Sequence, residues 1–211
     1  IYACDRAVKR DLPGGARWTR EFVVEIPVAE PEKWLAAVEI CESTIGFLTG
    51  DVWHLDFVEA QRPRLGRDFK RTRRAFRRKR NIQGDAVALF SGGLDSLVGV
   101  IDWLEDNPDG KLVLASTYDA QAEPAHADQC RILPQLEREI NYRGRVQHYV
   151  TRTGVLAGGK DTNFRSRSLS FIGNAILGAS FLGDGTPIVI PENGAIAVNY
   201  PLTPARRGSL S

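Results

Sequence analysis

The sequence has few of the residues that mark metal sites, disulfide frameworks or membrane spans. Its 211 residues include only three cysteines, Cys4, Cys41 and Cys130, whose wide spacing matches no zinc-ligand pattern. An odd and scattered set of cysteines indicates reduced thiols, so we expect a cytoplasmic protein. No apolar run approaches the roughly 20 residues that a membrane helix needs. We therefore expect no membrane partner and no zinc site built from these cysteines.

Methionine is absent altogether, so the sequence contains no initiator residue. The last residues, ARRGSLS, end no recognisable element. We therefore expect the sequence to be a piece of a longer protein, truncated at its C-terminal end. Its composition, 43% hydrophobic and 26% charged, is that of an ordinary globular chain that can bury a core.

Residues 85–105, DAVALFSGGLDSLVGVIDWLE, carry the clearest chemical signal. Residues 87–90 form an apolar run of strand length, which predicts a central strand of a parallel sheet. After the glycine pair, apolar residues recur with the period of a helix, at Leu94, Leu97, Val98, Ile101 and Leu104. The pattern predicts a strand, a glycine turn and a helix in succession.

A helix that begins directly after a glycine turn presents unpaired N–H groups, which attract anions. Gly92 and Gly93 let a phosphate approach the backbone, and Ser91 and Ser96 add hydroxyl donors. Asp95 suits the same place as a ligand of a divalent cation bound to the phosphates. The alternative is a tight turn that serine and aspartate merely cap. We favour a site for nucleotide phosphate and magnesium, because two glycines, two serines and an acid coincide at one junction.

The hexapeptide SGGLDS resembles the SGGxDS motif of the PP-loop, or N-type, ATP pyrophosphatases. The resemblance implies an adenine nucleotide alpha hydrolase-like fold and the cofactors ATP and Mg²⁺. In that superfamily a substrate oxygen attacks the α-phosphate to give an adenylate and pyrophosphate, and a nitrogen or sulfur nucleophile then displaces AMP. The resemblance implies catalytic roles for Asp95 and Ser96, with Asp95 also on magnesium through the phosphates. It implies ATP binding by Phe90, Ser91, Gly92, Gly93, Leu94, Asp95 and Ser96.

Residues 1–60 predict a small α+β unit. Residues 17–26 alternate like a half-buried strand, Pro31 can open a helix, and residues 52–58 predict a second strand. Its core is expected to contain three large aromatic residues, Trp18, Trp34 and Trp53.

Residues 61–82 predict a basic linker or helix. From Arg62 to Arg80 the chain carries eleven lysines and arginines against one aspartate, so this segment has a charge of +10 and the rest sums to −8. Such segregation attracts RNA, DNA or an acidic partner. It is equally typical of the solvated face of a linking helix, because aromatic residues do not alternate with the charges.

Residues 83–211 predict an α/β domain, an open parallel sheet with helices on both faces. Three further strands are expected, at residues 112–117, 145–151 and 186–190. The intervening helices are expected at residues 124–142 and from Leu169, where Leu169, Ile172, Ile176, Leu177 and Phe181 repeat every three to four residues.

Ligands of such sheets gather at the carboxyl ends of the strands. Tyr118 and Asp119 end the second strand and are therefore expected on the nucleotide side. Glu192, Asn193 and Gly194 follow the last strand, and a carboxylate beside an amide can recognise the donor edge and carbonyl of a guanine-like base. The alternative for these three residues is an ordinary turn.

Three cations are candidates for neutralising phosphate. Lys160 is the last residue of GVLAGGK, which matches the start of a Walker loop. The next residue is Asp161, where a Walker loop has Ser or Thr, so we expect instead a flexible loop whose lysine reaches the phosphates. Arg165 and Arg167 precede the apolar helix and favour anion binding at its start, unless they are ordinary surface arginines. In the helix expected at residues 124–142, the side chains of Asp128 and Gln129 either face the ligand or lie on the surface of the protein.

From residue 85 onward, the SGGLDS strand, the FRSRS region and ENGAIAVNYP resemble the 7-cyano-7-deazaguanine synthase family. The longer stretch IPENGAIAVNYPLTPARRGS, with an extra N-terminal unit, resembles the synthase-like proteins of bacterial anti-phage defence loci. That family adenylates the carboxylate of 7-carboxy-7-deazaguanine, lets ammonia attack, and activates the amide again to give the nitrile. Its zinc-binding cysteine cluster is missing from this sequence, so either zinc is bound by residues beyond Ser211 or the defence relatives differ from the family in this respect.

The resemblance thus implies a ligase that forms a C–N bond, releases AMP and pyrophosphate, and works with protein partners of a defence operon. Its attacking amine, and its product as an amide, a nitrile or a conjugate, stay open. Two other classes stay open as well. One is a module that senses ATP or a deazapurine without turnover, and the other is a tRNA-modifying enzyme that holds RNA with the basic segment.

Overall fold

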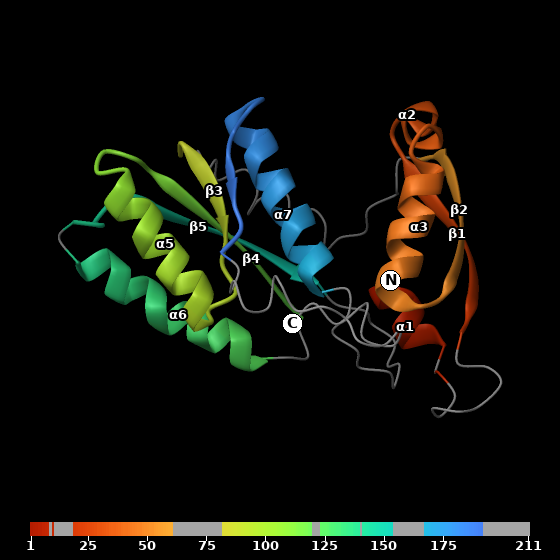
Figure 1. The fold of residues 1–211 in the computed structure, drawn as a ribbon, viewed down its shortest axis with the longest axis horizontal. Helices are drawn as coiled ribbons and strands as arrows, with labels where there is room; N and C mark the ends of the chain where they lie inside the picture. Colours follow the sequence, from red (N-terminus) through yellow and green to blue (C-terminus); the bar gives the residue numbers. More distant parts are fainter. Residues whose placement is uncertain are drawn as a thin grey trace, which may run out of the picture. The chain divides into compact units, whose positions relative to one another are not determined.

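The computed structural model describes residues 1–8, 10, 19–60, 82–119, 123–139, 141–153 and 167–191. These residues fall into two compact units, one before residue 61 and one from Ile82 onward. Figure 1 shows the helices and strands of both units. Within the described ranges, no helix is long and apolar enough to cross a bilayer.

The first unit is built on two parallel strands, β1 (Glu21–Val28) and β2 (Val52–Glu59), which pair along their whole length. Helix α1 (Tyr2–Ala7) precedes them, and α2 (Pro31–Leu35) and α3 (Val38–Thr49) connect them. The predicted strands are confirmed. The predicted α+β class is wrong for this unit, because parallel strands need a crossover connection and the two helices provide it.

Aromatic side chains form the core of this first unit. Phe22 of β1 and Trp53 of β2 are buried, with ring centroids 4.7 Å apart. Trp34 stacks on the buried Phe57 at 5.3 Å but stays 45% exposed, so it covers the core without filling it. The expected aromatic core is confirmed for Trp53, whereas Trp18 lies outside the described residues.

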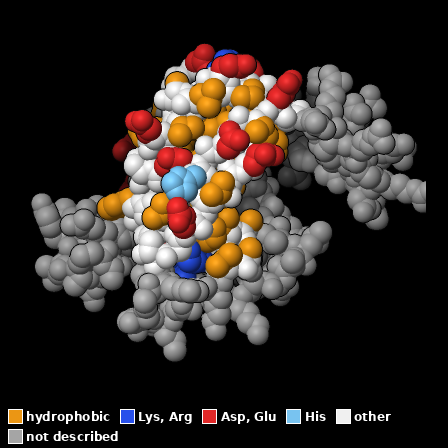
Figure 2. Space-filling view, turned by 90° about the vertical axis from the view of Figure 1, so that its right-hand side faces the viewer, with side chains coloured by type: hydrophobic (Ala, Val, Ile, Leu, Met, Phe, Trp, Pro, Cys, Tyr) orange, Lys and Arg blue, Asp and Glu red, His pale blue; other side chains and the backbone are white. Residues whose placement is uncertain are grey.

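The sheet face opposite the helices is exposed and acidic. Glu21, Val23 and Glu25 of β1 point to this face, and His54 and Asp56 of β2 lie beside Val23 and Glu25 in the register. Val23 is 81% exposed. Figure 2 shows acidic and apolar side chains mixed over this face. Part of the negative charge that balances the basic segment is therefore gathered here.

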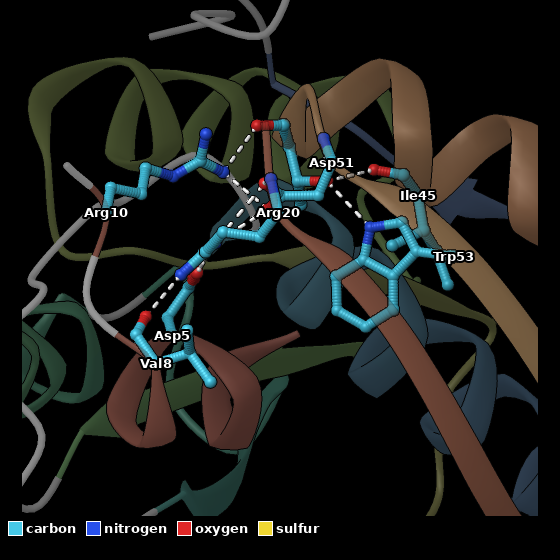
Figure 3. A network of polar contacts seen from close by, with 8 residues as sticks. Asp5, Val8, Arg10, Arg20, Ile45, Asp51 and Trp53 are labelled. Carbon is cyan, nitrogen blue, oxygen red and sulfur yellow. Dashed lines mark hydrogen bonds and ion pairs between the residues drawn. The ribbon is translucent and has the colours of Figure 1, made fainter. Parts of the chain in front are cut away.

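A buried ionic network fastens α1 to the strands (Figure 3). Arg20 places Nη2 2.6 Å from a carboxylate oxygen of Asp51 and 2.6 Å from one of Asp5. Arg10 donates to Asp51 at 2.5 Å and to the carbonyl oxygen of Thr49 at 2.6 Å. The two arginines and two aspartates are each at most 9% exposed, and their charges balance. Burial acts to lower the pKa of Arg20, but the hydrogen bonds to the two aspartates outweigh burial and raise it.

Removal of Asp51 tests this network, since Asp51→Ala leaves Arg10 and Arg20 buried without their shared carboxylate. Breaking a buried ion pair from one side costs about 3–5 kcal/mol, so we expect the free energy of unfolding to fall by that amount. Urea denaturation followed by tryptophan fluorescence measures it. Asp56→Ala, at an exposed position of β2, is the control and should change stability by less than about 0.5 kcal/mol. Equal losses in the two variants would show that the network does not hold the unit together.

The second unit is an open parallel sheet of four described strands, β3 (Ala86–Leu89), β4 (Leu112–Asp119), β5 (Val146–Thr153) and β6 (Ile188–Val189). Their order in the sheet is β5-β4-β3-β6, and every neighbouring pair is parallel. The chain therefore steps outward from β3 to β5 and then returns to the other side of β3. The four predicted strands are confirmed.

Helices cover both faces of this sheet (Figure 1). On one face lie α5 (Leu94–Asp106) and α6 (Glu123–Arg138), which bury Val100, Leu104 and Leu136 against the strands. These three residues pack in one cluster with the even-numbered side chains of β3 and β4, because successive side chains of a strand alternate between faces. The predicted open parallel sheet with helices on both faces is confirmed.

The other face is covered by α7 (Arg167–Leu182), which packs through small residues. Ala175 and Ala179 are buried against the sheet, whereas Ile176, Leu177 and Phe181 are 55%, 45% and 59% exposed. The apolar repeat in the sequence thus predicts the helix correctly, but part of that repeat points away from the sheet. Small side chains let this helix lie close to the β-branched residues of the strands.

The segment after β6 packs on α5 at Gly99. A β-carbon built on Gly99 would lie 2.6 Å from Cβ of Pro191, so Gly99→Ala is expected to lower stability by about 1–3 kcal/mol through overpacking. Gly173→Ala in α7 is the matched control, because no described atom lies within 4 Å of its added carbon. There alanine should stabilise the helix by about 0.5–1 kcal/mol. Denaturant unfolding of both variants measures the difference, and a stabilised Gly99→Ala protein would contradict the close contact with Pro191.

Candidate functional site

The SGGLDS turn lies where the order of the sheet reverses. It follows β3, and Pro191 follows the neighbouring strand β6. The helix after β3 lies on one face of the sheet and the helix before β6 on the other. Open α/β sheets bind ligands outside the carboxyl ends of the two strands that flank such a reversal. The contact between Gly99 and Pro191 holds the start of the segment after β6 beside α5.

The two glycines of the turn differ in what they contribute. Gly92 has φ of 86°, in the left-handed region that favours glycine. Gly93 is the N-cap of α5 and is extended, with φ −82° and ψ 168°, so its backbone does not require glycine. No side chain caps this helix, and its first N–H groups are left for another acceptor. The turn therefore offers backbone donors at a helix N-terminus, which is the anion-binding arrangement that the sequence predicts.

The hydroxyl groups of the turn bond to the turn itself. Ser96, which is buried, donates from Oγ to the carbonyl oxygen of Gly93 at 2.8 Å. Ser91 donates from Oγ to Oγ of Ser96 at 3.2 Å and accepts the N–H of Gly93 at 3.3 Å. Both hydroxyl protons are thus used within the turn, and the serines hold its shape.

Asp95 and Leu94 are exposed in the first turn of α5, with Leu94 at 75%. A carboxylate at this end of a helix is favourably placed in the helix dipole. Across the described ranges, no cluster of three or more His, Cys, Asp or Glu side chains is arranged to hold a metal ion. The expected role of Asp95 as a ligand of magnesium stays a prediction.

A buried polar network lies directly behind the turn. Ser116 of β4 donates from Oγ to the carbonyl oxygen of Phe90 at 2.6 Å, and Nε2 of His148 lies 2.8 Å from the same Oγ. Because a hydroxyl has one proton, Nε2 of His148 is the donor in that contact. From α7, Asn174 donates to the carbonyl oxygen of Ser116 at 2.7 Å.

Gln129 of α6 completes this network. It is fully buried, and Nε2 lies 3.2 Å from the carbonyl oxygen of Ser91 and 3.4 Å from that of Phe90. The surface alternative for Gln129 is wrong because the residue is fully buried, and its amide contacts the backbone of the turn from behind. Its spacing of three, four and seven residues from Ile132, Leu133 and Leu136 is the signal that it shares their inward face.

The other expected site residues are placed only in part. Tyr118 and Asp119 are the last residues of β4, which continues past the level at which β3 ends. Arg167 is the first residue of α7. The remaining expected residues lie outside the described ranges: Lys160, Arg165, Glu192, Asn193 and Gly194.

Comparison with known proteins finds no matching family model, no matching curated protein and no matching solved structure. Function is therefore inferred from the residues of the turn and from the topology of the sheet.

Gly92→Ala tests the left-handed turn. An L-residue at this φ costs about 1–2 kcal/mol, so we expect the free energy of unfolding to fall by that amount. Gly93→Ala is the matched control: its backbone is extended and the added carbon would lie 3.4 Å from Oγ of Ser91, an ordinary contact. Because alanine is less favourable than glycine at an N-cap, the control should lose some stability, but less than Gly92→Ala, in the same denaturation assay. If the two variants lose the same stability, Gly92 does not adopt the left-handed conformation.

Proposed function

We propose that this chain is a PP-loop ATP pyrophosphatase of the 7-cyano-7-deazaguanine synthase type. In this proposal it adenylates the carboxylate of a 7-deazaguanine-type substrate, such as 7-carboxy-7-deazaguanine, and ammonia or another amine then attacks. One observation carries the proposal: the SGGLDS turn joins a left-handed Gly92 to an uncapped helix N-terminus at the reversal point of a parallel sheet. This arrangement supports an adenine nucleotide alpha hydrolase-like fold for the second unit.

The reaction requires stabilisation of the charge on departing pyrophosphate. The carboxylate oxygen forms a bond to the α-phosphorus while the bond from that phosphorus to the bridging oxygen breaks. The N–H groups at the start of α5 then bind the oxygens of the leaving group, and the positive end of the helix dipole favours their charge. In the second step the amine attacks the acyl carbon, AMP leaves and the nitrogen loses a proton.

Magnesium, when bound, would neutralise part of the pyrophosphate charge, and Asp95 is the residue of the turn that suits it. Ser91 and Ser96 keep the turn in shape, as their hydrogen bonds indicate. One or more of Lys160, Arg165 and Arg167 would add positive charge, as their places in the sequence indicate. Tyr118 and Asp119 would contact the nucleotide from the carboxyl end of β4.

Substrate recognition is assigned to the segment that follows β6. Glu192, Asn193 and Gly194 come directly after Pro191 in the sequence, and Pro191 itself packs on α5 at Gly99. The proposal also includes protein partners from a defence operon and nucleic acid bound by residues 62–80. Only the sequence supports these two parts.

Turnover of defined substrates tests the function. The protein is incubated with Mg-ATP, 7-carboxy-7-deazaguanine and ammonium, and chromatography follows AMP, pyrophosphate and any new amide or nitrile. We expect AMP and pyrophosphate in equal amounts together with the new product. Binding of ATP or the deazapurine without AMP release would indicate the sensor module, and AMP release that requires tRNA would indicate a tRNA-modifying enzyme. A protein that binds neither ATP nor the deazapurine, with or without tRNA, would exclude all three.

Asp95→Ala tests the role of the carboxylate in the turn. Because Asp95 is exposed, the variant should keep its stability within about 0.5 kcal/mol. AMP formation should fall by at least about 100-fold, the size of effect seen when one electrostatic stabiliser is removed. Asp102→Ala, at an exposed position of the same helix, is the control and should leave the rate unchanged. Unchanged AMP production by the Asp95→Ala protein would exclude this residue from the reaction.

A further inference from the structure

We infer that Gln129 is a positioning residue, which holds two successive carbonyl groups and thereby aims the N–H groups of the phosphate-binding turn. The inference rests on the proposed function, in which this turn binds nucleotide phosphate. Gln129 lies on α6, 38 residues from Ser91, so the turn is held by an element outside its own strand and helix.

The contact is made from inside the protein. Gln129 is 0% exposed and donates from Nε2 to the carbonyl oxygens of Ser91, at 3.2 Å, and Phe90, at 3.4 Å. The Phe90 carbonyl has a second donor, Oγ of Ser116 at 2.6 Å. Among the described residues, the Ser91 carbonyl has only Gln129. The orientation of the peptide group between Ser91 and Gly92 therefore depends on this one side chain.

Because the peptide group is planar, the contact to the Ser91 carbonyl also fixes the direction of the N–H group that follows it. In a trans peptide the C=O and the following N–H point in opposite directions. Since the Ser91 carbonyl points to α6, the N–H of Gly92 points away from it, and the Phe90 carbonyl directs the N–H of Ser91 in the same way. Neither N–H has a hydrogen-bond partner among the described residues. With Gly92 left-handed, these donors form the kind of nest that binds phosphate.

Packing alone is a poor explanation for an amide at this position. Oε1 of Gln129 is buried and has no hydrogen-bond partner in the described part of the chain. A buried acceptor without a partner destabilises a fold, and an apolar side chain of similar size would avoid it. An amide at this position is therefore explained by its N–H donors, which bind the carbonyl oxygens of Phe90 and Ser91 behind the turn.

Binding of pyrophosphate and of Mg-ATP by Gln129→Met measures the effect, because methionine keeps the length of the side chain and removes both donors. Isothermal titration should show both ligands bound at least about tenfold more weakly, since misdirecting one N–H loses a hydrogen bond to a charged group. The melting temperature should change little, because the variant loses the unpaired Oε1 while the Ser91 carbonyl becomes unpaired in its place. Gln135→Met, at an exposed position of α6, is the matched control and should bind both ligands like the parent protein.

A second variant keeps the shape of the side chain. Gln129→Glu presents a donor only when its carboxyl group is protonated. Its pyrophosphate affinity, taken relative to the parent protein at each pH, should therefore recover as the pH is lowered, whereas that of Gln129→Met should not. A residue that only fills space would show no such difference between the two variants. If the methionine variant folds poorly, the pH dependence of Gln129→Glu relative to the parent protein still reports on the donor.

A third measurement needs no nucleotide. In ¹⁵N-labelled unliganded protein, Gln129→Met should shift the amide resonances of Ser91 and Gly92, and Gln135→Met should not. If the parent protein binds neither pyrophosphate nor Mg-ATP, the proposed function fails while these resonances still report on positioning. If the parent protein binds both ligands, equal affinity in Gln129→Met together with unmoved Ser91 and Gly92 resonances overturns the inference.

Discussion

The orientation of the peptide group between Ser91 and Gly92 decides what the turn after β3 can bind. Its carbonyl is held from α6, its N–H points the other way, and the left-handed φ of Gly92 then carries the chain into α5. The two serine hydroxyls are used up inside the turn, so the backbone supplies the donors for an anion. The site is thus built from main-chain geometry that side chains on other elements support.

The parallel sheet gives this turn its surroundings. Because β3 is a central strand with β4 on one side and β6 on the other, the ends of three strands lie along one edge. The register shows how far β3 and β4 extend toward this edge. Leu89, the last residue of β3, pairs with Ala115, and β4 continues four residues further to Asp119. The turn therefore sits beside the longer end of β4, which is where a nucleotide bound at the turn would extend.

The first unit depends on a different kind of interaction. Its two-stranded sheet is too small to bury a large core, and a charge-balanced cluster of Arg10, Arg20, Asp5 and Asp51 lies beside the aromatic pair. Guanidinium groups suit this place because each presents several donors in a fixed plane. The hydrogen bonds hold the chain before β1 against the start of β2, which hydrophobic packing alone does not specify.

The sequence by itself determined the succession of strand, glycine turn and helix and the four strands of the parallel sheet, because these depend on local periodicity and on residue types at fixed spacing. Only the tertiary structure decided that the first unit is a parallel crossover, that Ala175 rather than Phe181 faces the sheet, and that Gln129 lies beneath the turn. Each of these depends on contacts between residues far apart in the chain. Periodicity shows that a residue lies on a helix face, but only packing decides which neighbour that face meets.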